Sequence, residues 1–572
     1  MKKNWRLNPK ITPDLQNQFP EINPIVLQLL DEMGINTQEK IDEFWNPDYG
    51  QDLHNPFLFL DMEKAVKRIF KAIKKEEKIL IWGDYDADGV TSSAVLYSTL
   101  KKLGAQVEVY LPDRELEGCG LNIEGLKKLK NKKIKLIITV DCGISNAEEA
   151  ELVKKLGIDL IITDHHSQPL KLPKAYAIIN PKLEKEKYPF RELAGVGVAF
   201  KLAQALLKES KIDIEKGFEK WLLDLVALGT VADCEPLLGE NRTLVKYGLV
   251  VLNKTRRLGL QELIKISNLN NLLDSEHISF QLGPRLNAAS RMDHANTAFE
   301  LLTTESEKEA REIAKKLNQI NQQRQLMIGK IMQEAKEQIK GEKDKKIIIV
   351  ESPKKWFWPV GIIGLVAGRL QDELYKPVIV ITKIDKKGLQ GSSRSVPEFN
   401  IVKALQECGR HLLRYGGHPE ASGFSLEENK LSEFKEEINK IAERELKNLE
   451  LFSWLKINAK LDLGDINWDL QEELEKFEPF GESNKKPKFL SVNLQITGLE
   501  KLGKNEQHLK LSVIQSSFNS KKFIGFGLGK TIGSKLKIGD MVDIVFELGV
   551  NEWNGNKELQ MKIIEIDITN IK

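Results

Sequence analysis

Residues 78–94 read KILIWGDYDADGVTSSA, an apolar run followed by three aspartates within five positions. The run 78–82 has the length and apolar character of a buried β-strand. Asp84, Asp86 and Asp88 follow it, where their like charges repel one another and resist removal from water. Such a concentration of carboxylates at the end of a buried strand indicates a bound partner of opposite charge.

The same stretch matches the first six positions of a calcium-binding loop, D-x-D-x-D-G. The twelfth position of that loop is a bidentate glutamate, but counting from Asp84 it is Val95. The residues before the loop are also strand-like rather than helical. These two departures exclude an EF-hand.

Aspartate and histidine residues also come directly after two later predicted strands. They are Asp141 after KLIITV (135–140), and Asp164, His165 and His166 after DLIIT (159–163). Alternation of strands with amphipathic helices predicts βαβ units and a parallel sheet, whose strands all end at one edge. One aspartate at a strand end is usually a helix N-cap, but three such ends favour a shared site. Asp233, after the apolar segment ALGTVAD, can close the cluster.

Charge and donor type identify the partner. The five carboxylates of Asp84, Asp86, Asp88, Asp141 and Asp233 suit two divalent cations better than one. Oxygen donors with a single imidazole favour Mn²⁺ or Mg²⁺ over zinc. Two such ions about 3.5–4 Å apart stabilise the attacking and leaving oxygens of displacement at phosphorus. The residues therefore predict a two-metal phosphoryl-transfer site.

Composition limits the protein class. The chain of 572 residues is too long for one core, and its formal net charge of +3 excludes polyanion binding by overall charge. Its first residues contain no apolar signal core, and no apolar stretch approaches a membrane span. Four scattered cysteines fit reduced thiols. We therefore expect a cytoplasmic protein.

Five segments are expected along the chain: an N-terminal segment (1–55), a catalytic α/β domain (56–304), a long connecting helix (305–340), a smaller α/β domain (341–450) and a C-terminal OB-type β-barrel (451–572). The helix is strongly polar with one narrow apolar stripe, which is typical of a spacer or brace. Residues 485–537 carry eleven lysines and two acids. Lysines on a barrel can be an ordinary soluble surface, but this excess favours single-strand binding.

The ordered motifs GDYDADG, VDCG, TDHH and ALGTVAD resemble the DHH phosphoesterase superfamily. GPRLNAASRM, GSSRS, YGGHPEASGF and FEPFGESN further resemble its bacterial RecJ exonucleases. The resemblance implies a DHH catalytic domain, a DHH-associated domain and an OB fold. It also implies hydrolysis of single-stranded DNA from the 5′ end to mononucleotides, in DNA repair and recombination.

The resemblance assigns roles to particular residues. The implied metal ligands are Asp84, Asp86, Asp88, Asp141, His165 and Asp233. His166 is implied to contact the scissile phosphate or to assist the leaving group, and Asp164 to orient the histidines. The implied phosphate and strand contacts are Arg114, Arg285, Asn287, Arg291, Ser392, Arg394, Gly416, Gly417 and His418. Among these, a grip on the 5′-terminal phosphate by Ser392, Arg394 and His418 would set the polarity.

The implied ligands are two divalent cations, with Mn²⁺ preferred over Mg²⁺, and single-stranded DNA with a free 5′ end. A RecQ-type helicase and a single-strand-binding protein are the implied partners of a monomer that contacts no membrane. Cys119, Ser290 and Pro359 depart from the tyrosine, glycine and histidine usual in the family. Three alternatives stay open: a DHH phosphodiesterase for short oligonucleotides, a catalytically inactive strand-binding scaffold, and an inorganic pyrophosphatase.

Overall fold

The computed structural model describes residues 4–129, 132–342, 344–384, 388–516, 519–553 and 555–568. The chain forms two compact units. The first comprises His54–Glu235 and Tyr247–Ser453, and the second comprises the described residues of Lys3–Leu53, Pro236–Lys246 and Trp454–Lys572. Within the described part of the chain, no helix is long and apolar enough to cross a bilayer.

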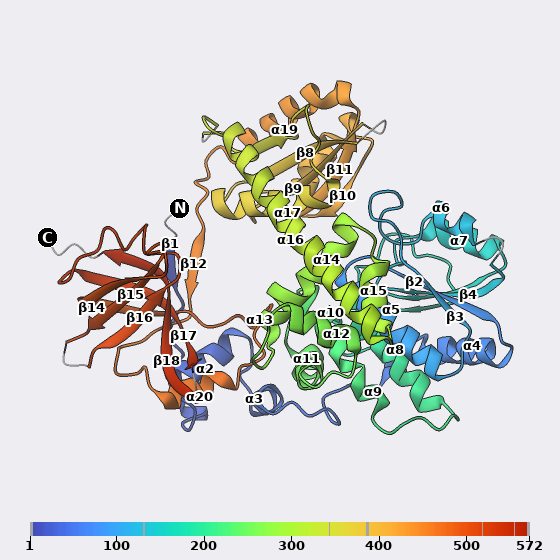
Figure 1. Cartoon of the computed structure of the whole chain (residues 1–572), viewed down its shortest axis with the longest axis horizontal. Coiled ribbons are helices and arrows are strands. Elements are labelled where there is room, and N and C mark those ends of the chain that lie inside the picture. Colours follow the sequence, from blue (N-terminus) through green and yellow to red (C-terminus); the bar gives the residue numbers. More distant parts are fainter. Residues whose placement is uncertain are drawn as a thin grey trace. The chain divides into compact units, whose positions relative to one another are not determined.

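A five-stranded parallel sheet forms the centre of the first unit, in the order β3-β2-β4-β5-β6 (Figure 1). Its strands are β2 (Lys78–Gly83), β3 (Val107–Tyr110), β4 (Ile134–Val140), β5 (Asp159–Thr163) and β6 (Ala177–Ile179). The strand β4 is buried at every position except Lys135, as expected for a strand covered on both faces. The predicted parallel α/β sheet is confirmed.

Helices cover both faces of this sheet. They are α4 (Met62–Lys74), α5 (Ala87–Lys102), α6 (Ile123–Lys128), α7 (Ala147–Lys155) and α8 (Gly195–Glu209). The helices α6 and α7 share an apolar cluster with Leu80, Ile137 and Ile162. The helix α5 packs against α8 and against β2, and α8 contacts β4.

A helical layer follows the sheet in sequence. It contains α9 (Phe218–Trp221), α10 (Leu223–Ala232), α11 (Gly239–Leu252), α12 (Leu258–Ile266), α13 (Ser275–His277), the π-helix η2 (Ile278–Leu282), α14 (Gly283–Met292) and α15 (Asn296–Thr303). The long helix α16 (Glu307–Gln338) then packs on α12, α14 and α15, and further along on α17 (Val360–Leu374).

A smaller mixed sheet completes the first unit, in the order β10-β11-β9-β8-β7. Its elements, besides α17, are β7 (Ile348–Glu351), β8 (Val378–Ile384), β9 (Gly388–Arg394), α18 (Ile401–Glu407), β10 (Arg414–His418), β11 (Ala421–Leu426) and α19 (Leu431–Glu445). The strand β10 lies at the edge, and all five of its residues are exposed.

The second unit is a small β-barrel, because β14 pairs with both β15 and β17. Its strands are β12 (Trp454–Ile457), β13 (Ala459–Lys460), β14 (Phe489–Leu502), β15 (His508–Ile514), β16 (Lys521–Gly525), β17 (Met541–Trp553) and β18 (Asn556–Ile568). The expected OB-type barrel is confirmed.

Residues from the start of the chain belong to this barrel unit. They form β1 (Asn4–Leu7), α1 (Pro13–Gln18), α2 (Pro24–Glu32) and α3 (Gln38–Trp45). The strand β1 pairs in parallel with β12. Apolar residues of α2 and α3 join one continuous core with α20 (Trp468–Glu475) and the barrel strands.

Arg242 holds three segments of this unit together. Its side chain is 1% exposed and donates hydrogen bonds to four carbonyl oxygens, those of Phe44, Lys476, Phe477 and Glu478, at 2.8–2.9 Å. The guanidinium also lies 3.8 Å from the centre of the Phe44 ring. A planar group with five donors can satisfy several buried carbonyls at once, which a lysine could not.

We expect Arg242→Ala to lower the free energy of unfolding of the barrel unit by about 3–5 kcal/mol, because four buried carbonyls lose their donor. Urea denaturation of the full chain measures this loss. Arg256→Ala removes an exposed arginine of the first unit and serves as the control. Equal denaturation midpoints for the two variants would contradict the structural role of Arg242.

Candidate metal centre and phosphate-binding face

The three acidic motifs meet at one edge of the central sheet. Asp84 follows β2, Asp141 follows β4, and the DHH triplet 164–166 follows β5. These three strands are neighbours in the sheet, so their carboxyl ends lie side by side. Asp233 is the C-cap residue of α10 and reaches the same edge from the helical layer.

Three overlapping groups of possible metal ligands form here. One is Asp141, His165 and His166, and the other two divide the six proposed ligands between them. Asp88, His165 and Asp233 place one ligand atom each within 4.8 Å of one another, and so do Asp84, Asp86 and Asp141. The two groups touch, since His165 Nε2 lies 3.1 Å from Asp141 Oδ1. All six residues named from the sequence are therefore brought together, and no member is left over.

Backbone N–H groups hold Asp88 in place. Its two carboxylate oxygens accept hydrogen bonds from the N–H groups of Gly195 and Val196, at 2.7 and 2.8 Å, in the first turn of α8. A helix N-terminus favours a negative charge at this point. Gly195 is required here, because a Cβ atom would lie 2.5 Å from Asp141 Oδ1.

The remaining aspartates of the first motif are also fixed by the local backbone. Asp86 caps α5, and its Oδ1 accepts hydrogen bonds from the N–H groups of Asp88 and Gly89. Asn287 Oδ1 accepts from the Ala87 N–H at 2.9 Å, so this residue of α14 steadies the aspartate loop. Asp86 therefore caps the helix α5 and also lies in the acidic cluster.

Glu235 was not identified from the sequence. Its Oε1 lies 2.9 Å from His165 Nδ1, which leaves His165 Nε2 facing the aspartates. A carboxylate on the far nitrogen fixes the orientation of a ligating histidine and makes it a stronger ligand. The only sequence signal was that Glu235 stands two positions after Asp233 in VADCEP.

Asp164 is turned away from both groups of three. It is 1% exposed and accepts hydrogen bonds from the N–H groups of Ile144, His165 and His166. Its Oδ1 also lies 2.8 Å from His166 Nδ1, and this contact raises the pKa of His166. The His166 side chain is 48% exposed, and one of its ring nitrogens lies within 4.8 Å of ligand atoms of Asp141 and His165.

Burial and mutual repulsion favour protonated carboxyls in this cluster. Removal from water raises the pKa of Asp88 to about 6, that of Asp84 to about 7 and that of Asp233 to about 8. The pKa of Asp141 is also raised, by burial and by Asp88. Hard carboxylate donors with one oriented imidazole fit divalent cations of the Mn²⁺ and Mg²⁺ type, whose charge would relieve this repulsion.

The smaller sheet presents the candidate phosphate-binding residues on one face. Ser392 and Arg394 lie two residues apart on β9, and Gly416 and His418 lie two residues apart on β10. The strand β11 lies between them. Its Gly423 is in register with Ser392 and Gly416, and its Ala421 is in register with Arg394 and His418. Residues two apart in a strand share a face. Gly417 lies between Gly416 and His418 with φ +141°, where a Cβ would strike β11. All of these residues belong to strands β9 and β10.

Candidate arginines lie between this face and the acidic cluster. Arg114 stacks on the Tyr85 ring at 4.8 Å. Burial, and after it the charge of Arg114, lowers the pKa of both Arg394 and Arg291. Arg291 Nη1 donates to the carbonyl oxygen of Gly361. Arg285 is directed elsewhere, because it donates to Asn318 on α16 and to Gln281.

The three unusual residues have defined places. Cys119 Sγ lies 3.1 Å from Asp84 Oδ2 and donates to it. Ser290 Oγ donates to the carbonyl of Asn287 within α14. Pro359 is the N-cap residue of α17. Cys119 is thus the one departure that touches a proposed metal ligand.

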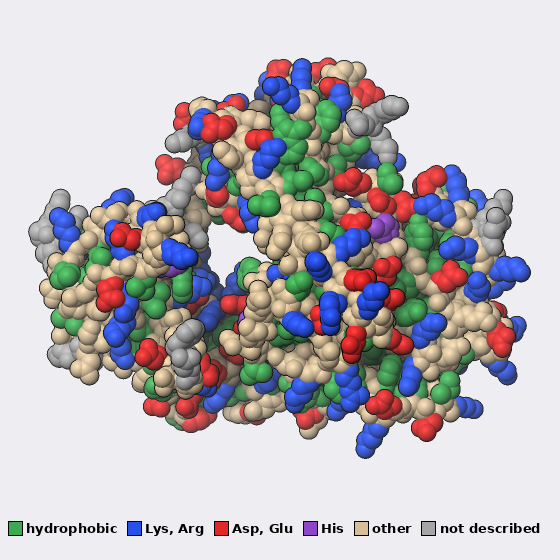
Figure 2. Space-filling view, in the orientation of Figure 1, with side chains coloured by type: hydrophobic (Ala, Val, Ile, Leu, Met, Phe, Trp, Pro, Cys, Tyr) green, Lys and Arg blue, Asp and Glu red, His purple; other side chains and the backbone are tan. Residues whose placement is uncertain are grey.

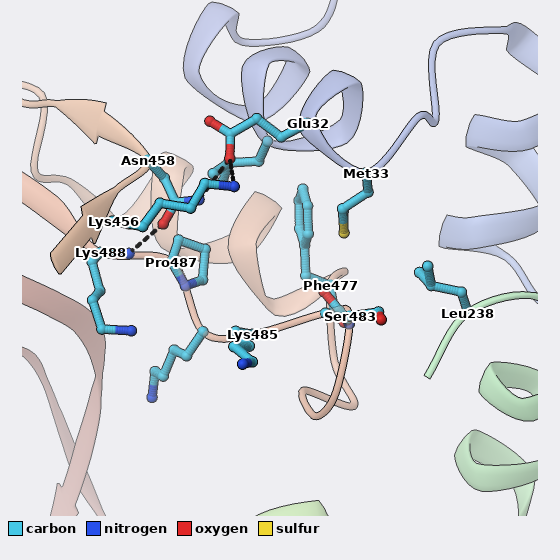
Figure 3. Close-up of a pocket in the computed structure, with 13 residues that line it drawn as sticks. Glu32, Met33, Leu238, Lys456, Asn458, Phe477, Ser483, Lys485, Pro487 and Lys488 are labelled. Atoms are coloured by element: carbon cyan, nitrogen blue, oxygen red, sulfur yellow. Dashed lines mark hydrogen bonds and ion pairs between the residues drawn. The ribbon is translucent and has the colours of Figure 1, made fainter. Parts of the chain in front are cut away.

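The barrel unit has a lysine-rich cavity of about 500 Å³ (Figure 3). Lysines 456, 485, 486 and 488 line it, with Phe477 and Met33 among the apolar residues. Its one acid, Glu32, is engaged by Lys456 and Asn458. Positive charge is therefore local, since the molecular face in Figure 2 mixes acidic and basic side chains.

An acidic cluster at the ends of β2, β4 and β5, followed by a second α/β domain, defines a DHH-type phosphoesterase. Residues 78–230 match the DHH family N-terminal domain, and residues 344–444 match the DHHA1 domain. Residues 457–565 match the RecJ OB domain.

The chain is 40% identical to the single-stranded-DNA-specific exonuclease RecJ of Bacillus subtilis, over 95% of this chain and 68% of that protein. It therefore belongs to the RecJ family. The fold resembles that of Thermus thermophilus RecJ in complex with Mn²⁺, with a TM-score of 0.83 and 26% identity, over 99% of this chain and 80% of that one. The Mg²⁺ complex of the Thermus protein gives a TM-score of 0.77 with 26% identity, over 99% and 79% of the two chains.

Glu235→Ala is expected to weaken Mn²⁺ binding about 10- to 100-fold, because His165 loses the acceptor that orients it. Isothermal titration of the purified chain with Mn²⁺ measures the affinity. Glu235→Gln keeps an acceptor oxygen and should lose less. Glu209→Gln, an exposed site on α8, provides the control. Wild-type affinity in Glu235→Ala would remove this residue from the site.

Mn²⁺ affinity should rise with pH between about 6 and 8. The pKa values of Asp88, Asp84 and Asp233 are raised to about 6, 7 and 8 in the metal-free protein. The protonated forms therefore persist to higher pH, and a cation must expel those protons to bind. Titrations in two buffers of different ionisation enthalpy report the protons released. A pH-independent affinity would contradict these raised values.

Proposed function

We propose that this protein is an exonuclease that removes 5′-mononucleotides successively from the 5′ end of single-stranded DNA. The observation that carries the proposal is the clustering of six possible ligands, four of them buried, in two touching groups of three, in a chain of the RecJ family. The B. subtilis relative is named as single-stranded-DNA-specific. A role in DNA repair and recombination follows from this family.

The proposed cofactors are two divalent cations, with Mn²⁺ preferred and Mg²⁺ accepted. Asp84, Asp86 and Asp141 would hold one cation, and Asp88, His165 and Asp233 the other. RecJ structures with either ion support divalent metal in this fold. When bound, such ions neutralise charge on the attacking and leaving oxygens at phosphorus.

The residues of the chain position and protonate the substrate. Water adds to the scissile phosphorus, and the bond from phosphorus to the 3′ oxygen of the terminal nucleotide breaks. His166, held at Nδ1 by Asp164, would supply a proton to that leaving oxygen. Arg291 and Arg114 would stabilise the phosphate charge, and Asn287 keeps the aspartate loop in place.

Polarity would come from an anchor at one side of the metal centre. Ser392, Arg394 and His418 share one face of the smaller sheet, and we propose that they bind the 5′-terminal phosphate, with Gly416 and Gly417 allowing close approach. One nucleotide then fits between the anchor and the scissile bond. The lysine-rich barrel would bind the strand at a further point.

The proposed substrate is single-stranded DNA with a free 5′ end, delivered by a RecQ-type helicase and a single-strand-binding protein to a monomer in the cytoplasm. The complete ligand set disfavours an inactive scaffold. The barrel disfavours a pyrophosphatase or an enzyme restricted to short oligonucleotides, since neither substrate requires a strand-binding module.

End-labelled single-stranded DNA tests the proposal. With Mn²⁺, a 5′ label should appear at once as mononucleotide, whereas a 3′-labelled strand should shorten gradually. Asp141→Ala should abolish cleavage and retain DNA binding, while Asp213→Ala, at an exposed position, should behave as wild type. Early release of the 3′ label would refute the polarity, and an active Asp141→Ala variant would refute the metal assignment.

A further inference from the structure

The strand β6 adds a fourth strand end to the edge that carries the acidic cluster. It pairs in parallel with β5, and its last residue, Ile179, is in register with Thr163, directly before the DHH triplet 164–166. Asn180 and Lys182 come after β6 just as the triplet comes after β5. Neither residue was identified from the sequence, because neither is acidic or a histidine. Since parallel strands end together, both belong to the surroundings of the histidines.

Asn180 connects the histidines to the segment that follows β6. It is fully buried. Its Nδ2 donates a hydrogen bond to the carbonyl oxygen of His166 at 2.9 Å, and its Oδ1 accepts one from the backbone N–H of Lys182 at 2.8 Å. A buried amide that is paired at both ends fixes the two chain segments that it joins. The backbone of Lys182 therefore has a defined position relative to the histidines.

The side chain of Lys182 lies between two carboxylates. Its Nζ is 3.5 Å from Glu235 Oε1 and 3.9 Å from Glu192 Oε2. The side chain of Glu192 is 49% exposed, whereas that of Glu235 is 11% exposed. An exposed ion pair contributes little, but a largely buried carboxylate is costly without a nearby cation. The contact with Glu235 is therefore the more important of the two.

One oxygen of Glu235 joins this lysine to the metal centre. Glu235 Oε1, the atom near Lys182, also lies 2.9 Å from His165 Nδ1. On the other side of the ring, His165 Nε2 lies 3.1 Å from Asp141 and 3.6 Å from Asp233. Of the lysines and arginines that the structure describes, Lys182 alone forms an ion pair with Glu235. The contacts thus run from Lys182 through one carboxylate oxygen and one imidazole to the proposed ligands.

This carboxylate needs a second partner to stay at the histidine. A glutamate side chain has several rotatable bonds, and fixing them costs free energy. A hydrogen bond with a neutral imidazole offsets little of this cost, whereas a charge-assisted contact with an ammonium group offsets more. Lys182 supplies that contact on the same oxygen that meets His165 Nδ1.

We propose that Lys182 is a positioning residue of the metal centre. It holds Glu235 against His165 Nδ1, so that His165 Nε2 stays directed at the aspartates and at the cation bound among them. This inference rests on the proposed function, in which His165 is a metal ligand. In this role Lys182 touches neither the cation nor the DNA, and its whole effect on metal binding passes through Glu235.

Isothermal titration of the full chain with Mn²⁺ provides the first test. We expect Lys182→Met to weaken Mn²⁺ binding about tenfold, since outer partners of a ligating histidine contribute about 10- to 100-fold to affinity. Lys182→Arg keeps a cation at this position and should restore most of the affinity. Lys185→Met removes an exposed lysine of the same segment and is the matched control.

The direction of the change separates positioning from charge. Removing a positive charge near the site would by itself strengthen the binding of a cation. A loss of affinity in Lys182→Met therefore identifies positioning. Unchanged or tighter Mn²⁺ binding in this variant would overturn the inference.

A double-mutant cycle separates positioning from a general effect on the fold. Because Lys182 acts through Glu235, Lys182→Met should change Mn²⁺ affinity less than about twofold when Glu235 is already alanine. Equal losses in both backgrounds would overturn the inference. Urea denaturation of each variant checks folding, and Lys182→Gln repeats the cycle should Lys182→Met fold poorly.

Crystal structures of the metal-free variants provide a test that does not depend on the cation. In Lys182→Met we expect the Glu235 carboxylate to leave His165 Nδ1, whereas in Lys185→Met it should stay within hydrogen-bond distance. An unmoved Glu235 in Lys182→Met would overturn the inference. If the wild-type protein bound no Mn²⁺, the metal assignment of the proposed function would fail, and the position of Glu235 in these crystals would still decide the role of Lys182.

Discussion

The carboxylates at the ends of β2, β4 and β5 repel one another in a place largely closed to water, and the surrounding fold is built to tolerate this. Asp88 is held by the first turn of α8, and Asp86 is held by the first turn of α5. Close packing of these helices requires a glycine at position 195, because a side chain there would displace Asp141. The ends of the sheet strands, the first turns of α5 and α8, and Gly195 therefore all serve to hold the mutually repelling carboxylates in place.

Buried arginines, like the buried carboxylates, are tolerated only where the surroundings provide hydrogen-bond partners. Arg242 in the barrel unit is buried with four carbonyl acceptors. Arg242 is satisfied within the protein, so it stabilises the fold. Arg291 donates from Nη1 to the carbonyl of Gly361, and the buried Nε atoms of Arg291 and Arg324 have no acceptor among the described residues.

The sequence predicted the features that local chemistry determines. Strand–helix alternation and residues placed directly after strands were enough for the parallel sheet and for the meeting of Asp84, Asp141 and His165 at one edge, because parallel strands end together. Glu235 was missed because its contact with His165 joins positions 70 apart, which no local pattern reports. The long helix was expected to act as a spacer or brace, and α16 packs on α12, α14, α15 and α17.

The barrel unit is assembled from residues far apart in the chain. The helices α2 and α3 are synthesised before their core partners. Those partners, on α20 and the barrel strands, begin beyond Trp454, about 400 residues later. At roughly 5–20 residues per second, that interval on the ribosome is about 20–80 seconds. During this time the catalytic unit can fold, while the apolar faces of the first helices have no barrel to cover them. The apolar faces of α2 and α3 thus stay exposed until the barrel strands have been made.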